Sequence, residues 1–326
     1  MTDSIMVSVC CTTYNQEKYI RRCLDGIVNQ QCSFQFEVFV HDDASTDDTP
    51  KIISEYAQKY PNIIKPILQT ENQYSKGVFI TLNLIVPFAK GKYFAFCEGD
   101  DFWTDPHKLE KQVKALENHP NCHLCLHTVK GIKEDETPVG IMYPNFSLES
   151  GIISGAQLLD YICTNEYVFQ TTSYFMRTAD LKRYALKPPS FRMVSATGDT
   201  PYLLYFSTLG DTYYLADIMS CYRHTSLENN PRKAKYMNTE EKIVAHYNKQ
   251  IQMMEEFDKY TNGKYHKLCQ RKIDGYYYDK AARNHDYKEM SKHKYSFYKK
   301  DWSSKARIKL FLLAHFPFLI KEKNNE

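Results

Sequence analysis

The run from Cys97 to Trp103 has the residue types of a cation site. It reads Cys-Glu-Gly-Asp-Asp-Phe-Trp, with carboxylates at Glu98, Asp100 and Asp101 around one glycine. Hard divalent cations prefer oxygen ligands, and Mg²⁺ is typically held by one or two carboxylates together with substrate phosphates. Such an ion neutralises the charge that develops on a diphosphate leaving group. Acidic turns in solvent are also common, so this run alone leaves both interpretations open.

A second acidic cluster occupies residues 42–49, which read Asp-Asp-Ala-Ser-Thr-Asp-Asp-Thr. Acids that directly follow a strand can accept hydrogen bonds from a nucleotide base or from a ribose hydroxyl. We favour this role for Asp43. Asp47, Asp48 and Thr49 precede Pro50 and suit the cap and first turn of a helix, which is the role that we expect for them.

Apolar runs and helical patterns alternate through the first 120 residues. Strands are predicted at residues 5–11, 36–40, 63–68 and 93–97, and helices at 16–30, after Pro50, at 78–89 and from 105 to about 119. This β-α-β-α-β-α-β order predicts an α/β fold with an open, mostly parallel sheet and helices on both faces. Ligands of such sheets bind beyond the carboxyl ends of the strands, where both acidic clusters fall.

The pattern after residue 120 is more mixed. Strands are predicted at 124–129, 171–176 and 218–222, and helices at 154–162 and 200–209, with a helical, Lys- and Tyr-rich sequence from 239 onward. The break at residues 228–231 predicts a boundary near residue 230. We therefore expect an α/β domain over 1–230 and a helical C-terminal region over 231–326.

Composition and charge narrow the class of protein. The 326 residues are 43% hydrophobic and 25% charged, which is typical of a globular protein rather than a disordered or fibrous one. The net charge is +3, and residues 285–326 contain ten Lys or Arg against five Asp or Glu. Because the basic charge is concentrated in the tail while the central motifs are acidic, nucleic acid is not an expected partner.

The ten cysteines are expected to be reduced thiols. The N-terminus has no basic, cleavable leader and enters at once into a strand-like run, so we expect a cytoplasmic protein. Residues 122–127 read Cys-His-Leu-Cys-Leu-His and raise the alternative of a zinc site. A strand is the favoured interpretation, because apolar and polar residues alternate there and a second ligand pair is not evident.

Three ordered blocks together resemble the family 2 glycosyltransferases, the inverting group with the GT-A fold. The blocks are residues 7–20, residues 42–49 and residues 91–103. The likeness is good over about residues 5–120 and looser over 120–225. It implies a Rossmann-like GT-A domain that transfers a sugar from a nucleotide-diphosphate donor, with UDP the expected nucleotide. The acceptor implied is a glycan or a lipid-linked saccharide, as in surface polysaccharide biosynthesis.

The resemblance also implies roles for the donor-binding residues. Thr12, Tyr14 and Asn15 would border the nucleotide base, and Asp43 would bind the base or the ribose. Asp100 would be a ligand of Mn²⁺ or Mg²⁺ and would contact the diphosphate. Glu98 stands where the family has the first aspartate of its Asp-x-Asp motif, so we expect this longer side chain to contact the ribose or the sugar.

Two further positions follow from the same resemblance. Asp199, between Gly198 and Thr200, matches the catalytic position of the family and would be the general base, although its sequence context also suits a helix N-cap. His224 would reach the metal or the diphosphate, whereas a lone histidine is more often a surface or core residue. Lys76 and Arg223 could meet phosphates, but solvated side chains are the default expectation for them.

The tail suggests two different environments. Five Lys or Arg residues between positions 299 and 309 precede an apolar run at 310–320 that is too short to cross a bilayer. Basic residues beside an apolar patch suit contact with an anionic membrane, at the inner face of the cell membrane for a cytoplasmic enzyme. Pro317 limits a continuous amphipathic helix, and a helix packed on the body of the protein is the alternative.

Two other functional classes share some of these features. A nucleotide-sugar pyrophosphorylase or another nucleotidyltransferase also combines a parallel sheet with an acidic metal site. Such enzymes are expected to have a Gly-rich, basic phosphate loop near the first strand, and residues 12–16 read Thr-Thr-Tyr-Asn-Gln instead. A non-catalytic protein that retains the fold is the other alternative, and the presence of Asp100 and Asp199 disfavours it.

Overall fold

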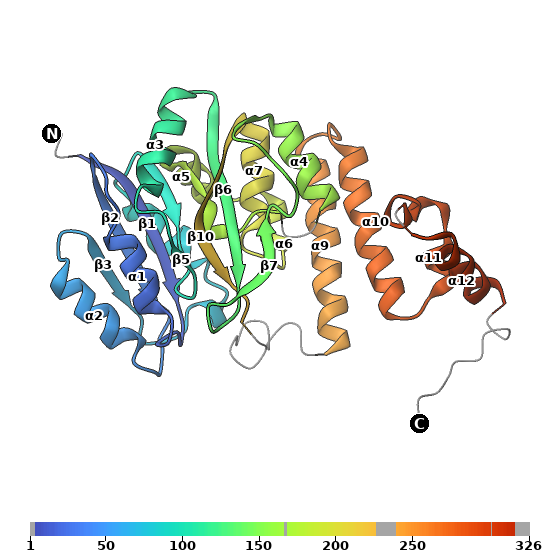
Figure 1. The fold of residues 1–326 in the computed structure, drawn as a ribbon, viewed down its shortest axis with the longest axis horizontal. Helices are drawn as coiled ribbons and strands as arrows, with labels where there is room; N and C mark the ends of the chain where they lie inside the picture. Colours follow the sequence, from blue (N-terminus) through green and yellow to red (C-terminus); the bar gives the residue numbers. More distant parts are fainter. Residues whose placement is uncertain (1–3, 166–167, 226–238, 301, 317–326) are drawn as a thin grey trace. The chain divides into compact units, whose positions relative to one another are not determined.

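The computed structural model describes residues 4–165, 168–225, 239–300 and 302–316 (Figure 1). The chain forms two compact units. The first comprises Met1–Pro188 and Asp199–Ser226, and the second comprises Pro189–Gly198 and Leu227–Glu326. The boundary predicted near residue 230 lies outside the described residues. The ten residues that precede Asp199 pack with the C-terminal unit, which the sequence did not indicate.

Ten strands form one sheet in the described part of the chain. They are β1 (Ile5–Thr13), β2 (Gln35–Asp42), β3 (Ile64–Leu68), β4 (Tyr93–Phe96), β5 (Phe102–Trp103), β6 (Cys122–Ile132), β7 (Pro138–Tyr143), β8 (Gly151–Ile153), β9 (Phe175–Arg177) and β10 (Asp211–Arg223). The order across the sheet is β3-β2-β1-β4-β9-β6-β10-β5, with β7 beside β6 and β8 beside β10.

The sheet is parallel in its first half and mixed in its second. β3, β2, β1 and β4 run parallel to one another, as the alternating strand and helix signals predicted. Beyond β4, the short strand β9 is antiparallel to both of its neighbours, and β5 is antiparallel to β10. β6 and β10 are again parallel. The expected "mostly parallel" sheet therefore describes only the N-terminal half.

The first unit contains six α-helices and four shorter helical segments among its described residues. The α-helices are α1 (Ile20–Val28), α2 (Thr49–Lys59), α3 (Lys108–Asn118), α4 (Gly155–Thr164), α5 (Thr178–Leu186) and α7 (Thr200–Leu209). The shorter segments are η1 (Tyr74–Lys76), η2 (Thr81–Ile85), η3 (Val86–Phe88) and η4 (Thr171–Ser173). The single helix expected at 78–89 is divided into the π-helical η2 and the 3₁₀-helical η3. Pro87 accounts for this division, because proline inside a helix clashes with the carbonyl of the preceding turn.

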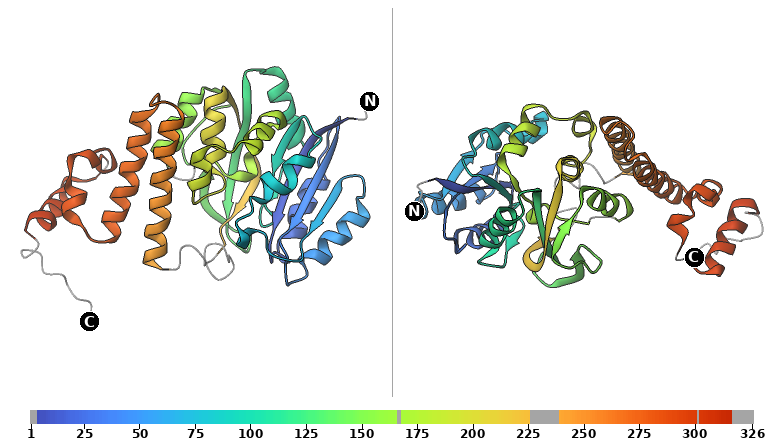
Figure 2. Two further views of the ribbon diagram at one scale, coloured as in Figure 1. Left: turned by 180° about the vertical axis from the view of Figure 1, so that it is seen from behind. Right: turned by 90° about the horizontal axis from the view of Figure 1, so that it is seen from above.

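Helices cover both faces of the sheet, which confirms the prediction (Figure 2). Successive side chains of a strand point to opposite faces. Val7, Val9 and Cys11 of β1 enter the apolar core that side chains of α1, α2 and α3 complete. Cys10 points to the other face, where its Sγ lies 3.6 Å from Oγ1 of Thr81 in η2. β1 is therefore buried on both sides.

The second unit is helical in its described residues. It contains α6 (Ser190–Val194), α9 (Glu240–Tyr260), α10 (His266–Arg283), α11 (Tyr287–Ser291), η5 (His293–Tyr295), η6 (Phe297–Lys299) and α12 (Ser304–His315). The ring of Phe191 in α6 lies edge-on to Phe257 and Tyr260 of α9, with centroids 5.3 and 5.2 Å apart. These aromatic contacts explain why residues 189–198 belong to this unit.

A lysine is fully buried at the start of α3. Lys108, at the start of α3, is 0% exposed, and its Nζ donates a hydrogen bond to Oε1 of Gln112 at 2.7 Å. The Nζ also lies 4.0 Å from the ring centroid of Trp103, a position that favours the charged form. Burial outweighs this contact and lowers the pKa of Lys108 to about 7.

This pKa makes stability depend on pH in a defined direction. The unfolded chain keeps the Lys108 proton up to about pH 10.4, whereas the folded chain keeps it only up to about pH 7. Proton binding by the unfolded chain therefore destabilises the fold as pH falls from about 10 to about 7, and the effect is constant below that. The difference in unfolding free energy between Lys108→Met and the parent should therefore shift by a few kcal/mol in favour of the variant when the pH is lowered from 10 to 7. Urea unfolding at each pH measures this difference.

The change of this difference with pH excludes the constant cost of leaving Oε1 of Gln112 without its donor. Lys114→Met is the matched control, because Lys114 is exposed on the same helix and should show a difference that does not change with pH. A pH-independent difference for Lys108→Met would mean that the buried amine stays protonated in the folded chain.

Candidate active site

The acidic run is held against the end of β1. Parallel pairing of β1 with β4 continues past the end of β4, because the amide of Cys97 donates to the carbonyl of Cys10 and that of Gly99 to the carbonyl of Thr12, both at 3.0 Å. The loop that contains Glu98 and Asp100 therefore follows the carboxyl end of β1. This is the edge where the sequence predicted that both acidic clusters would lie.

Glycine is required at the centre of this loop. A Cβ on Gly99 would lie 2.5 Å from Oε1 of Gln16 and 2.8 Å from Oγ1 of Thr13. These two side chains are themselves fixed, since the Thr13 hydroxyl donates to Oε1 of Gln16 at 2.7 Å. Any larger residue would push the acidic loop away from the turn that follows β1.

The predicted base-binding residues lie at that turn. Thr12 is at the end of β1, and Tyr14 and Asn15 follow it, all three partly exposed. Oδ1 of Asn15 accepts from the amide of Thr46 at 2.8 Å, and the amide of Asn15 donates to Oγ of Ser45 at 2.8 Å. Asn15 therefore fastens the turn after β1 to the turn after β2. Its predicted contact with the base remains a prediction.

Asp43 is buried at the end of β2 and organises another turn. Its Oδ1 accepts from the amide of Gln73 at 2.7 Å, and its Oδ2 accepts from the amide of Tyr74 at 3.1 Å. Its carbonyl accepts from Nδ2 of Asn72 at 3.1 Å. The sequence pattern did not indicate this long-range role. Each carboxylate oxygen has a second lone pair, so the clamp is compatible with the predicted nucleotide contact.

Arg223 differs from the expectation of a solvated side chain, because its guanidinium is only 1% exposed. Its Nε donates to the carbonyl of Asp100 at 2.9 Å, and its Nη1 donates to the carbonyl of Glu134 at 2.8 Å. Nη2 lies 3.2 Å from Oε1 of Glu136. The five donors of a guanidinium thus join the acidic loop to the β6–β7 turn. Lys76, the other cation considered for phosphate contact, forms an ion pair with Glu71.

Asp101 is the interior member of the acidic run. It is 2% exposed, and its Oδ1 accepts from the amide of Arg223 at 2.9 Å. Burial raises the pKa of Asp101 well above its ordinary value, and the charges of Asp100 and Glu98 raise it further. Its Oδ2 is buried and has no hydrogen-bond partner within the described residues. Glu98 and Asp100 are partly exposed and are the acids of the run that can meet a ligand.

The pKa of Tyr222 in β10 is affected by several of the predicted acids. Burial raises the pKa of Tyr222, and the negative charges of Asp101, Glu98, Asp100 and Asp199 each raise it further. These carboxylates come from two segments about a hundred residues apart, yet all act on one phenol. The structure therefore brings the predicted residues Glu98, Asp100 and Asp199 into the same region. The sequence analysis did not single out Tyr222.

A second tyrosine supports this grouping. Burial raises the pKa of Tyr174, and the charges of Asp199 and Glu98 raise it further. Tyr174 precedes β9, the short antiparallel strand that lies beside β4. The ring of Tyr202 in α7, three residues after Asp199, packs 5.6 Å from the ring of Phe96 at the end of β4. This contact places the start of α7 beside the strand that leads into the acidic run.

Asp199 caps the helix that it precedes. It is the N-cap of α7, and its Oδ1 accepts from the amide of Thr200 at 2.7 Å. The capping role noted as an alternative from sequence is therefore present. It does not exclude a second role, since the same carboxylate acts on both Tyr174 and Tyr222.

His224 follows β10 and contacts aromatic residues. Its Nε2 lies 2.9 Å from the hydroxyl of Tyr143, and the ring is edge-on to Tyr222 with centroids 5.2 Å apart. No group of three or more His, Cys, Asp or Glu side chains arranged to hold a metal occurs in residues 4–165, 168–225, 239–300 and 302–316. Glu98 and Asp100 nevertheless offer two carboxylates, which suits a Mg²⁺-type ion that also binds substrate phosphates.

The Cys and His residues of 122–127 all lie on β6, as the alternation predicted. Nδ1 of His123 lies 2.6 Å from Oδ2 of Asp180. Nδ1 of His127 lies 2.8 Å from the carbonyl of Thr128. The two histidines of this strand therefore contact different partners, a carboxylate and a backbone carbonyl.

Two curated relatives are informative. The uncharacterized protein Rv1520 of Mycobacterium tuberculosis is 44% identical over 165 residues, which cover 50% of this chain and 46% of that protein. The poly(ribitol-phosphate) beta-glucosyltransferase of Bacillus spizizenii is 35% identical over 133 residues, or 40% of this chain and 20% of that enzyme. The chain spans about half the length, or less, of these curated relatives.

Two solved structures share the fold. S. aureus TarS 1–349 in complex with UDP-GlcNAc is 19% identical, with a TM-score of 0.57 over 86% of this chain and 92% of that chain. The mannosyltransferase PcManGT from Pyrobaculum calidifontis, in complex with GDP-Man and Mn²⁺, is 16% identical, with a TM-score of 0.55 over 98% and 83%. At these identities the likeness shows the fold, which is the GT-A architecture.

The sequence also matches a family as a whole. Residues 8–185, more than half of the 326, match the family model described as glycosyl transferase family 2. The matched region includes β1 from Ser8 onward with the turn that follows it, Asp43, and the acidic run at the end of β4. The chain therefore belongs to glycosyl transferase family 2.

Proposed function

We propose that this glycosyltransferase is an inverting enzyme that transfers a hexosyl or N-acetylhexosaminyl group from a nucleotide-diphosphate sugar, with UDP the expected nucleotide. The acceptor is a hydroxyl of a glycan or of a lipid-linked saccharide in surface polysaccharide biosynthesis. The observation that supports this most directly is that the loop of Glu98 and Asp100 is bonded to the carboxyl end of β1, while α7, which Asp199 caps, packs on the end of β4 through Tyr202 and Phe96. The names of the polymer-modifying relative and of the nucleotide-sugar complexes support the substrate class.

The turns after β1 and β2 form the proposed nucleotide site. Thr12, Tyr14 and Asn15 border the base, and Asp43 accepts from the base or the ribose. The hydrogen bonds of Asn15 and Asp43 with neighbouring backbone amides hold these turns in place before the donor arrives. Such preorganisation lowers the entropy cost of binding. Glu98 contacts the ribose or the sugar.

Asp100, with Glu98 beside it, is the proposed place for Mn²⁺ or Mg²⁺. A bound divalent cation stabilises the charge that accumulates on the departing diphosphate. Asp100 is suited to this position, because Arg223 holds its backbone carbonyl and the residue itself is partly exposed. His224 is a further proposed contact to the metal or the diphosphate.

Asp199 is the proposed general base. Inverting transfer requires the acceptor hydroxyl to attack the anomeric carbon from the face opposite the diphosphate, with loss of its proton. A carboxylate on a helix N-cap is held in one position, and one oxygen of Asp199 is already fixed by the amide of Thr200. The carboxylate accepts the acceptor's proton as the new glycosidic bond forms and the bond to the diphosphate breaks.

Donor hydrolysis and donor binding test this assignment. Across a panel of UDP-, GDP- and dTDP-sugars, we expect slow hydrolysis of one donor class with Mn²⁺ or Mg²⁺ and none with EDTA. Asp199→Asn should lower the hydrolysis rate by about 10²- to 10⁴-fold, the usual contribution of a general base, without changing donor affinity. Asp100→Ala should weaken metal-dependent donor binding, measured by calorimetry.

Asp48→Asn is the matched control, because Asp48 is an exposed cap residue of α2 at a side-chain exposure of 67%. Its activity should equal that of the parent. The proposal fails if no nucleotide sugar binds or is hydrolysed with either metal, or if Asp100→Ala keeps full activity. Turnover of a nucleoside triphosphate with a sugar phosphate would instead identify a nucleotidyltransferase.

We also propose that the C-terminal unit contacts an anionic membrane surface through α12. This helix buries Leu310 in a small core with Tyr278 and Tyr295, while Ile308 and Phe311 are 60% and 53% exposed. Lysines flank these apolar side chains along the helix. No helix in the described parts of the chain is long and apolar enough to cross a bilayer. Residues 317–326 of the predicted tail lie outside the described residues.

Vesicle flotation measures this contact. The chain should float with vesicles that contain an anionic phospholipid and remain at the bottom with neutral ones. Ile308→Ser combined with Phe311→Ser should reduce the floated fraction several-fold, because each change removes apolar surface worth about 1.5–3 kcal/mol when buried. Leu186→Ser, which changes an 89% exposed leucine of the first unit, should have no effect. Equal flotation of all variants would contradict the proposal.

A further inference from the structure

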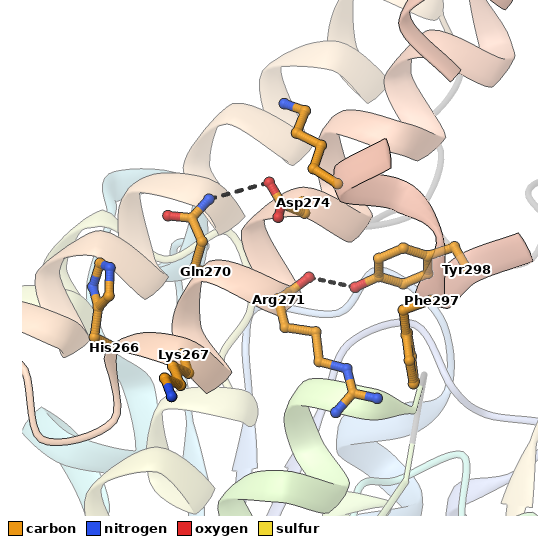
Figure 3. Close-up of a pocket in the computed structure, with 8 residues that line it drawn as sticks. His266, Lys267, Gln270, Arg271, Asp274, Phe297 and Tyr298 are labelled. Carbon is orange, nitrogen blue, oxygen red and sulfur yellow. Dashed lines mark hydrogen bonds between the residues drawn. The ribbon is translucent and has the colours of Figure 1, made fainter. Parts of the chain in front are cut away.

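The C-terminal unit contains a hollow between α10 and the η5–η6 segment (Figure 3). Its volume is about 380 Å³, within the range of about 300–1,000 Å³ typical of small-ligand sites. The side chains that line it are His266, Lys267, Gln270, Arg271, Asp274, Lys294, Phe297 and Tyr298. We refer to it as the α10 pocket. No part of the proposed transfer mechanism uses it.

The charge of the α10 pocket is positive. Lys267 and Arg271 contribute two cations, and Asp274 contributes the only acid of the described lining. Lys294 adds a third cation, which lies 3.5 Å from Oε1 of Glu289 outside the lining. Asp274 accepts a hydrogen bond from Nε2 of Gln270 at 3.1 Å. Side chains at positions i and i+4 share one face of a helix, so Lys267 and Arg271 present their charges on the same side of α10, as Figure 3 shows. The lining therefore favours an anionic ligand.

Arg271 is held by an aromatic ring. Its guanidinium carbon lies 3.3 Å from the centroid of the Phe297 ring. A guanidinium that stacks on a ring directs its N–H groups outward in its own plane, which is the geometry that binds a carboxylate or a phosphate through two bonds. Because the stack fixes the side chain, less rotamer entropy is lost when a ligand binds.

A glycine makes this arrangement possible. Gly275 lies one helical turn after Arg271, and a Cβ there would be 2.6 Å from the hydroxyl of Tyr298. The same hydroxyl donates to the carbonyl of Arg271. Glycine inside a helix costs about 1 kcal/mol relative to alanine. Here it lets Tyr298 lie against α10 and brings the neighbouring Phe297 to Arg271.

The surroundings suit a saccharide better than a small inorganic anion. A second hollow of about 440 Å³ shares His266 and Gln270 with the α10 pocket and adds Glu255, Asp258 and Tyr277. Carboxylates and amides accept hydrogen bonds from hydroxyl groups, and aromatic rings pack against apolar ring faces. A chain of sugars could place its acidic group in the α10 pocket and its hydroxyls over the second hollow.

We infer that the α10 pocket binds an acidic saccharide, namely a phosphate or carboxylate group on the acceptor polymer. The inference rests on the proposed function, since it names the chemical class of the acceptor. A site of this kind on the helical unit would raise the local concentration of a long acceptor at the enzyme without contributing to bond formation.

Binding of defined polymers to the full chain tests the inference. We expect binding of poly(ribitol phosphate), of polygalacturonate or of both, and no binding of neutral dextran, in biolayer interferometry at low salt. Binding of only one polymer identifies the phosphate or the carboxylate as the group recognised. Lys267→Gln combined with Arg271→Gln should raise the dissociation constant by about tenfold or more, because two charge-assisted contacts are lost.

Lys249→Gln combined with Lys288→Gln is the matched control. Both lysines are exposed in the same unit and outside the pocket, so the control removes the same net charge. Equal weakening by both double variants, or equal binding of dextran, would overturn the inference. Binding restricted to anionic vesicles, with none to either acidic polymer, would overturn it as well.

Donor hydrolysis by the same variants separates the two proposals. The Lys267→Gln and Arg271→Gln pair should hydrolyse the donor at the parental rate, because neither residue belongs to the transfer machinery. A parent chain that binds acidic polymer but hydrolyses no donor would reject the proposed transfer and leave the pocket established. A parent chain that hydrolyses the donor but binds no acidic polymer would reject the pocket alone.

Discussion

The buried guanidinium of Arg223 connects the acidic loop to the sheet. Three carboxylates in four residues repel one another, and such a loop would turn outward unless its backbone were held. Arg223 binds the carbonyl of Asp100 with its side chain and Oδ1 of Asp101 with its amide. A cation that is 1% exposed requires several acceptors, so the loop and the guanidinium depend on each other. The close approach of Gly99 to the end of β1, where its amide donates to the carbonyl of Thr12, holds the loop from its other side.

This attachment divides the acids into two kinds. Asp101 points inward, where burial raises its pKa and favours its neutral form. Glu98 and Asp100 remain at the partly exposed edge of the loop. The sequence shows three acids of similar type, and burial is what separates their chemistry.

The sequence predicted those features that depend on local pattern. Continuous apolar runs located β1, β2 and β4, and the carboxyl-end rule indicated where the acidic clusters would lie. Features that depend on distant pairing were not visible. The clamp by Asp43 joins residues thirty positions apart, and Arg223 reaches a loop more than a hundred positions away. β9 was predicted too long, because its strand signal begins in a 3₁₀ turn at Thr171–Ser173.

The order of the chain links Asp199 to the helical unit. Residues 189–198 pack within that unit, through Phe191 against Phe257 and through Oγ of Ser195, which lies 3.1 Å from Sδ of Met253. Asp199 is the first residue after this segment. A chain cut near residue 230, at the boundary that the sequence suggested, would leave 189–198 without its packing partners. The segment that leads directly into the proposed base would then lose the contacts that hold it.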